Sequence, residues 1–136
     1  MKSWYTLLFF HEGLGEAFLR MEDYAAMRRW LGHPQAEAVI AELERDGQMS
    51  SHLRWYRANL PPDAFVSPPP VLPPVQAPTL GIWSSADVAL TETQMTASAK
   101  FCANGFSYQR LEGLGHWMVL EDPRLVAGVI LAFVND

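Results

Sequence analysis

The prolines of this chain are concentrated in one stretch. Eight of the ten prolines lie between Pro61 and Pro78, and such a density excludes a regular helix or a central strand and favours an extended, semi-rigid connection. The stretch divides the 136-residue chain into two parts of different character. We therefore expect residues 1–60 to form one folded region and residues 79–136 to form a second, with residues 61–78 as the connection between them.

The part before the prolines has the pattern of a helical cluster. From Glu16 to Leu31 apolar residues recur at intervals of three and four, and Gly32 is placed to end that helix. A second helix is predicted from Pro34 to about Arg45, with proline in its first turn. A third is predicted from about Ser50 to Leu60, since Pro61 cannot continue a helix.

The part after the prolines alternates between strand and helix patterns. Residues 78–84 form a short apolar run bounded by turn residues, which is typical of a strand buried on both faces. A helix from Glu92 to about Ala103, a strand from Phe106 to Leu111 and a helix from Pro123 to about Val134 follow. This order predicts an α/β fold with parallel strands. Two strands alone, however, cannot make a sheet that is covered on both faces.

Composition excludes several classes of function. The 10 basic and 15 acidic side chains give a net charge of -5, which is the wrong sign for phosphates, so nucleic acid is not an expected partner. The lone Cys102 can form no internal disulfide and suits a reducing compartment, so we expect a cytoplasmic protein. No stretch approaches the ~20 apolar residues that cross a bilayer, so no membrane is expected as a partner.

Neither a metal nor a cofactor is predicted. The two Gly-Leu-Gly segments, at residues 13–15 and 113–115, lack the third glycine and the strand context of a dinucleotide loop and indicate turns. The histidines share no spacing that is typical of metal ligands. They are His11, His33, His52 and His116.

Asp87 and His116 are the candidates for chemistry. Asp87 follows the first predicted strand and His116 lies in the loop after the second, so both should lie at the carboxyl ends of neighbouring parallel strands, where open α/β sheets place catalytic groups. A carboxylate beside an imidazole fixes its tautomer and makes the pair a general base for water. The alternative is that Asp87 caps the following segment and His116 fills a turn.

The segments around these two residues resemble α/β-hydrolases. Residues 77–87 resemble the strand and loop that carry the acid of the catalytic triad in that family, and residues 111–117, followed by Leu-Glu-Asp-Pro at 120–123, resemble the loop that carries the histidine. The order, acid before histidine, is also that of the family. The resemblance implies the last βαβα portion of the hydrolase sheet, with Asp87 and His116 as triad members.

The helical part resembles the lid of the epoxide-hydrolase branch. Residues 3–5 and 55–59 resemble two lid segments that each present a tyrosine, here Tyr5 and Tyr56, to the active site. Two phenols suit that reaction, because the epoxide oxygen acquires charge as the ring opens. They could instead be core or interface aromatics. The family often has glutamine where Phe10 stands, so the polarity of the lid differs here.

A nucleophile is absent from these 136 residues. Neither Gly-x-Ser-x-Gly nor Gly-x-Asp-x-Gly occurs, and Ser84 and Ser85 lack the glycines of a nucleophile elbow. In the family the elbow and an oxyanion-hole loop precede the lid, so they would lie before residue 1. The core-like start, residues 4–10, is likewise typical of the interior of a longer protein.

The resemblance, which runs from Ser3 to Val134, implies an aspartyl-ester mechanism. An aspartate opens an epoxide, Tyr5 and Tyr56 donate protons to its oxygen, and His116 with Asp87 activates water to hydrolyse the ester. The expected partner is a small hydrophobic substrate, an epoxide or an ester. The alternatives are a fragment of a lidded esterase or dehalogenase, or a non-catalytic truncated product. The unpaired edge of a two-stranded sheet also predicts self-association.

Overall fold

The chain consists of two compact units, residues 3–70 and residues 71–136. The computed structural model describes residues 2–45, 47–59, 66–68 and 71–136. Within the expected proline-rich connection, residues 61–65 and 69–70 lie outside the described residues. In the part of the chain that is described, none of the helices has the length and apolar character needed to span a membrane.

The first unit is built of short helices around one apolar core. Its core residues are Phe9, Leu19, Tyr24, Ala26, Met27, Ile40, Leu43, Met49 and Leu53. Burying a side chain as large as Leu53 or Met49 contributes about 1.5–3 kcal/mol, so these contacts hold the helices together. In chain order the elements are η1 (Lys2–Tyr5), α1 (Thr6–Phe9), α2 (Leu14–Ala25), η2 (Ala26–Trp30), α3 (Ala36–Leu43) and α4 (Gln48–Asn59).

The predicted helix from Glu16 to Leu31 is not continuous. Glu22, Asp23 and Tyr24 have φ angles of 47°, 54° and 60°, in the left-handed region, and the wide π-helical turn η2 follows. Arg28 stabilises the irregular run by pairing with both Asp23 and Glu37. The Tyr24 hydroxyl is buried there and has no hydrogen-bond partner among the described residues. Apolar spacing could not reveal this break, because ion pairs outside the apolar pattern hold it.

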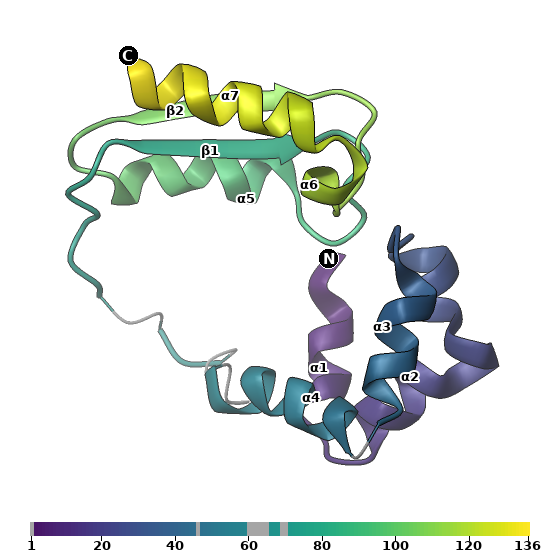
Figure 1. The fold of residues 1–136 in the computed structure, drawn as a ribbon. Helices are drawn as coiled ribbons and strands as arrows, with labels where there is room; N and C mark the ends of the chain where they lie inside the picture. The colour runs from purple at the N-terminus through teal and green to yellow at the C-terminus, as the bar shows by residue number, and fades with distance from the viewer. Residues whose placement is uncertain (1, 46, 60–65, 69–70) are drawn as a thin grey trace. The chain divides into compact units, whose positions relative to one another are not determined.

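The second unit is an α/β structure with two parallel strands, as the sequence predicted. It comprises β1 (Thr79–Ser84), α5 (Glu92–Ala97), η4 (Ser98–Phe101), β2 (Phe106–Leu111), α6 (Met118–Glu121) and α7 (Pro123–Asn135). The strands pair in register from Thr79 with Phe106 to Ser84 with Leu111. Parallel strands need a crossover, which α5 supplies, and Figure 1 shows α5 on one side of the strands and α7 on the other.

Local signals in the sequence explain where these elements begin. Thr91 and Gln94 form a capping box at the start of α5, and the Asp122 side chain accepts from the Leu125 amide at the start of α7. Gly81 lets the ring of Phe106 approach β1, since a Cβ there would lie 2.5 Å from that ring. These features fix β1, α5 and β2 as one packed βαβ unit.

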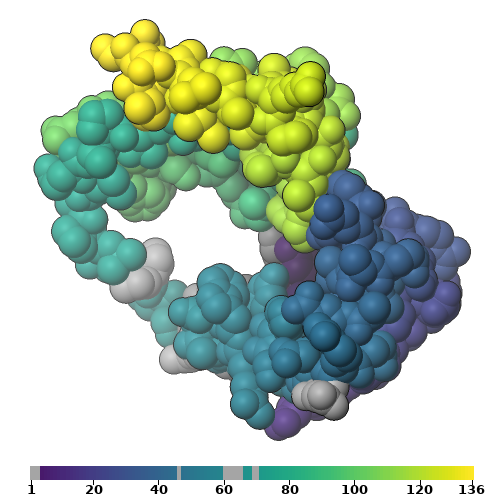
Figure 2. Space-filling model, viewed as in Figure 1, coloured from purple at the N-terminus to yellow at the C-terminus, as the bar shows by residue number. Residues whose placement is uncertain are grey.

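The apolar core of the second unit is small. Among the described residues, its buried large hydrophobics are Trp83, Leu111 and Val126. In the strand β2 most side chains are partly or fully exposed. Helix α7, which is drawn in yellow in Figure 2, also leaves Leu131 60% exposed and Val134 69% exposed.

Candidate active site

Asp87 lies in the tight turn that follows β1. Its Oδ1 accepts hydrogen bonds from the backbone N–H of Ala89 at 2.7 Å and of Leu90 at 2.9 Å. The Asp87 amide in turn donates to the Ser84 carbonyl at 3.1 Å. Because the side chain is buried, these bonds hold one carboxylate oxygen and direct the other, Oδ2, towards the loop after β2.

His116 lies in that loop, and neighbouring polar groups fix the loop backbone. The buried Ser84 hydroxyl donates to the Gly115 carbonyl at 2.6 Å, and the Gly115 amide donates to Glu121 at 2.7 Å. Ser85 accepts a further bond from the Gly113 amide at 2.8 Å. The imidazole is therefore carried on a backbone that is anchored both to the end of β1 and to α6.

The structure brings Asp87 and His116 into contact. The distance from Asp87 Oδ2 to His116 Nδ1 is 3.1 Å, and the His116 side chain is 27% exposed. Burial alone would raise the pKa of Asp87, but hydrogen bonds from Leu90, His116 and Ala89 outweigh it and hold that pKa below its ordinary value. The carboxylate thus stays charged at neutral pH. A charged carboxylate on Nδ1 orients the imidazole and stabilises its protonated form.

Tyr5 and Tyr56 belong to the first unit, where both rings pack against Phe9. The ring centroids lie 5.5 Å apart for Tyr5 and Phe9 and 5.0 Å apart for Tyr56 and Phe9, in edge-on geometry. Burial raises the pKa of the Tyr56 phenol, which keeps the proton on a group that would donate it. Both tyrosines are half-buried, as is Phe10. The two phenol-bearing segments, 51 residues apart in the chain, are thus neighbours.

Sequence reasoning missed a partly buried ion pair that joins α4 to α2, and a hydrogen bond from the same arginine that joins α4 to α1. Arg57, next to Tyr56, donates to both carboxylate oxygens of Glu16 at 3.0 Å and to the Phe9 carbonyl at 2.8 Å. Ser50 donates to the same carboxylate at 2.9 Å. The one signal for Glu16 in the sequence was its position three residues after Gly13. The Gly13 amide donates to the Glu16 carboxylate at 2.8 Å, which caps the start of α2.

Sequence reasoning also missed the residues that orient His116. Ser84 was considered only as a nucleophile, yet its hydroxyl is 1% exposed and bonded to the histidine loop. Glu121 carried no signal apart from its place before Asp-Pro. Within the described residues, no group of three or more potential metal ligands occurs.

No family model matches the chain, but one curated protein is similar over most of it. Epoxide hydrolase A of Mycobacterium tuberculosis (strain ATCC 25618 / H37Rv) is 26% identical over 116 residues, which are 85% of this chain and 35% of that protein. The chain therefore spans about a third of the length of this curated relative.

Two solved structures share the fold. They are the crystal structure of epoxide hydrolase A from Mycobacterium thermoresistibile, with a TM-score of 0.70 and 20% identity, and that of Bacillus megaterium epoxide hydrolase in complex with an inhibitor, with a TM-score of 0.69 and 18% identity. The similarity covers 97% and 99% of this chain and 52% of each of the other chains. The resemblance to the epoxide-hydrolase-like branch of the α/β-hydrolases is confirmed, and the chain has the fold of about half of such a protein.

Proposed function

We propose that this chain is the lid and acid-base half of an epoxide hydrolase that acts through an aspartyl ester. In this proposal residues 1–60 are the lid, residues 61–78 return the chain to the catalytic domain, and residues 79–136 complete its sheet. A segment outside these 136 residues supplies the nucleophile and the oxyanion-hole loop. The compartment proposed is the cytoplasm, in keeping with a lone cysteine.

The observation that carries the proposal is the contact between Asp87 and His116 at 3.1 Å. The pair lies where β1 and β2 end, which is where open α/β sheets place reacting groups. Ser84 and Glu121 bond the backbone beside the imidazole, so its position does not depend on the Asp87 contact alone. A capping turn would need none of these supports around a histidine.

The chemistry would proceed in two steps. The aspartate attacks a ring carbon of the epoxide, the carbon–oxygen bond breaks, and the oxygen takes a proton from Tyr5 or Tyr56, which are donors suited to a developing oxyanion. His116 then takes a proton from water as the water adds to the ester carbonyl, and Asp87 stabilises the resulting imidazolium. Collapse of that adduct breaks the ester carbon–oxygen bond, and the departing alkoxide takes the proton of the adduct hydroxyl, which releases the diol and restores the aspartate. The imidazolium proton returns through solvent to the tyrosinate, which restores His116 and the tyrosine.

The nucleophile would distinguish this proposal from its alternatives. A serine in its place would give an esterase, whereas an aspartate acting on a carbon–halogen bond would give a dehalogenase. A non-catalytic product would carry the same fold. The two half-buried phenols beside Phe9 favour the epoxide, because neither ester nor halide chemistry needs two proton donors in the lid.

The test is activity with and without a supplied nucleophile. The chain alone should not turn over an epoxide or 4-nitrophenyl acetate above buffer. A fusion protein would join the N-terminal part of the Mycobacterium tuberculosis relative, which supplies the nucleophile, to residues 2–136 of this chain. This fusion should hydrolyse the epoxide and not the acetate.

His116→Ala in the fusion should lower turnover by about 10²-fold or more, the contribution of a general base, while His52→Ala, on an exposed part of α4, should not. Turnover by the chain alone that depends on His116, or a cooperatively folding fusion without turnover, would contradict the proposal.

We also propose self-association through the edge of β1 and the exposed apolar face of α7. Within the described residues β1 pairs only with β2, and an unpaired apolar edge invites association. Light scattering of the 136-residue chain should therefore give a mass above 15.3 kDa. A monodisperse monomer with one sharp thermal transition would overturn this.

A further inference from the structure

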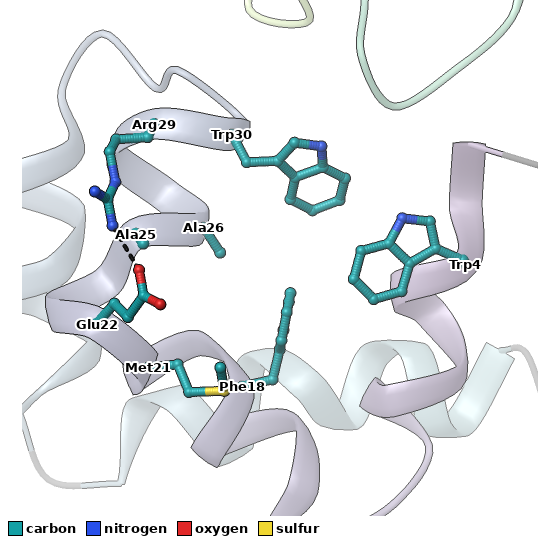
Figure 3. Close-up of a pocket in the computed structure, with 8 residues that line it drawn as sticks. All are labelled: Trp4, Phe18, Met21, Glu22, Ala25, Ala26, Arg29 and Trp30. Carbon is teal, nitrogen blue, oxygen red and sulfur yellow. Dashed lines mark hydrogen bonds and ion pairs between the residues drawn. The ribbon is translucent and has the colours of Figure 1, made fainter.

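A hollow of about 460 Å³ opens in the first unit. Figure 3 shows that the rings of Trp4, Phe18 and Trp30, from η1, α2 and η2, surround a common space. Its volume falls within the ~300–1,000 Å³ range of small-molecule sites. No step of the proposed reaction uses these three side chains.

The rings of the hollow are arranged as an aromatic box. Trp4 meets Phe18 edge-on, with centroids 5.6 Å apart and planes at 76°, and meets Trp30 in a tilted contact at 5.7 Å and 36°. Trp4 is nevertheless 44% exposed and Met21, on the wall, is 59% exposed. Large apolar side chains gathered at one opening and left facing solvent mark a binding surface.

The rim of the hollow carries no uncompensated charge. Arg29 and Glu22 lie on the wall and pair at 2.9 Å, as the dashed line in Figure 3 shows. A carboxylate or an ammonium ligand would have to compete with this pair. Offset and edge-on contacts with aromatic rings instead favour a flat neutral ring over a saturated group of the same size.

The backbone of the wall is irregular where it meets the hollow. Glu22 opens the left-handed run, and Trp30 ends the π-helical turn η2. Left-handed non-glycine residues and π turns persist only where the surroundings impose them, and both cluster at ligand-binding sites. Here Arg28 imposes the run by bonding Asp23 and Glu37 on either side.

We propose that this hollow binds a neutral, flat aromatic group. The Trp30 ring also contacts the Tyr5 ring, with centroids 5.0 Å apart, so the site adjoins one of the candidate proton donors. The consequence for chemistry rests on the proposed function: the substrates would be epoxides that carry an aryl substituent. Binding itself does not depend on that function.

The test is binding of a non-reactive aryl diol to the 136-residue chain. We expect 1-phenylethane-1,2-diol to bind about 2- to 12-fold more tightly than 1-cyclohexylethane-1,2-diol, as aromatic contacts allow. Its ring protons should give intermolecular NOEs to the indoles of Trp4 and Trp30. Ala25→Phe, which fills the hollow, should weaken binding at least about 10-fold, whereas Leu14→Ala, exposed on the same helix, should not.

Three results would overturn the site. The two diols could bind equally well, the NOEs could fall on other parts of the chain, or Ala25→Phe could keep both native circular dichroism and unchanged binding. If Ala25→Phe does not fold, the NOEs of the native chain decide. Turnover of an aliphatic epoxide by the fusion protein, without binding of the aryl diol, would overturn the aryl site and leave the proposed function. Aryl binding without any turnover would support the site and contradict the function.

Discussion

Replacing Asp87 by alanine should destabilise the second unit much more than replacing it by asparagine. The carboxylate accepts from the Ala89 and Leu90 amides, and Ala89 is 0% exposed. Alanine removes the acceptor of both bonds, and one of the two donors, the Ala89 amide, belongs to a fully buried residue. Asparagine keeps a carbonyl oxygen in the same position, but it loses the charge that faces His116.

The magnitude follows from the number of orphaned groups. Each polar group that loses its acceptor costs about 1–3 kcal/mol, so the two bonds lost in Asp87→Ala should lower the free energy of unfolding by about 2–6 kcal/mol. Asp87→Asn exchanges charge-assisted bonds for neutral ones and should cost about 1–2 kcal/mol. Asp136→Ala, an exposed control, should remain within about 0.5 kcal/mol of the native chain.

Urea unfolding gives the free energies, and amide hydrogen exchange locates the effect. Exchange at Ala89 and Leu90 should accelerate in Asp87→Ala and stay close to native in Asp87→Asn. Equal urea midpoints for the two variants, or native protection of Ala89 in Asp87→Ala, would refute the claim that this carboxylate organises the turn.

The same carboxylate predicts a dependence on pH. The pKa of Asp87 in the folded chain lies below its ordinary value of 3.8, so the folded state favours the charged form. Its contribution to stability is therefore present above about pH 4 and is lost as the pH falls through the lowered pKa. The difference in free energy of unfolding between the native chain and Asp87→Asn should shrink as the pH falls through that window.

Three further outcomes are expected. In an active fusion, Tyr5→Phe or Tyr56→Phe should slow ring opening by roughly 10-fold or more, because a lost hydrogen-bond donor costs about 1.4 kcal/mol of transition-state stabilisation. Unchanged single-turnover rates for both variants would show that the tyrosines serve only in packing. Glu22→Gly should raise the urea midpoint, because a left-handed non-glycine residue costs about 1–2 kcal/mol, whereas Glu42→Gly within α3 should lower stability by about 1 kcal/mol. Arg57→Met should cost about 3–5 kcal/mol in urea unfolding, since it leaves a buried carboxylate unpaired; a cost below 1 kcal/mol would show that the pair is dispensable.

Local patterns in the sequence were enough to predict most elements of the second unit. The short helix α6 was not predicted, and the helix expected from Glu92 to about Ala103 ends at Ala97 and continues as the 3-10 turn η4. The expected strand at 106–111 has those bounds in the structure, and the expected helix from Pro123 ends one residue later, at Asn135. The apolar runs, proline at the helix start and the capping aspartate act over a few residues, so they can be read locally. Strand order placed Asp87 and His116 at the ends of neighbouring strands, and the resemblance of their flanking segments to α/β-hydrolases supported them as a pair.

What could not be predicted depends on contacts between distant residues. The break at Glu22 is imposed by arginines that lie outside the apolar pattern, and the Glu16–Arg57 pair joins residues 41 apart. Ser84 was considered only as a nucleophile and was rejected for lack of elbow glycines, because the sequence does not show that the group it bonds lies 31 residues away. Such long-range polar contacts produce no periodic pattern in the sequence.

Asp87 and His116 lie on one βαβ crossover, 29 residues apart in the chain. The contact therefore forms as soon as β2 pairs with β1, and closing a loop of that length costs little more entropy than closing one half as long. The two side chains thus come together within one βαβ unit of the chain. Under the proposed function, exchange of residues 1–60 or of the nucleophile segment would leave this contact intact, so one acid–base pair would serve different substrates.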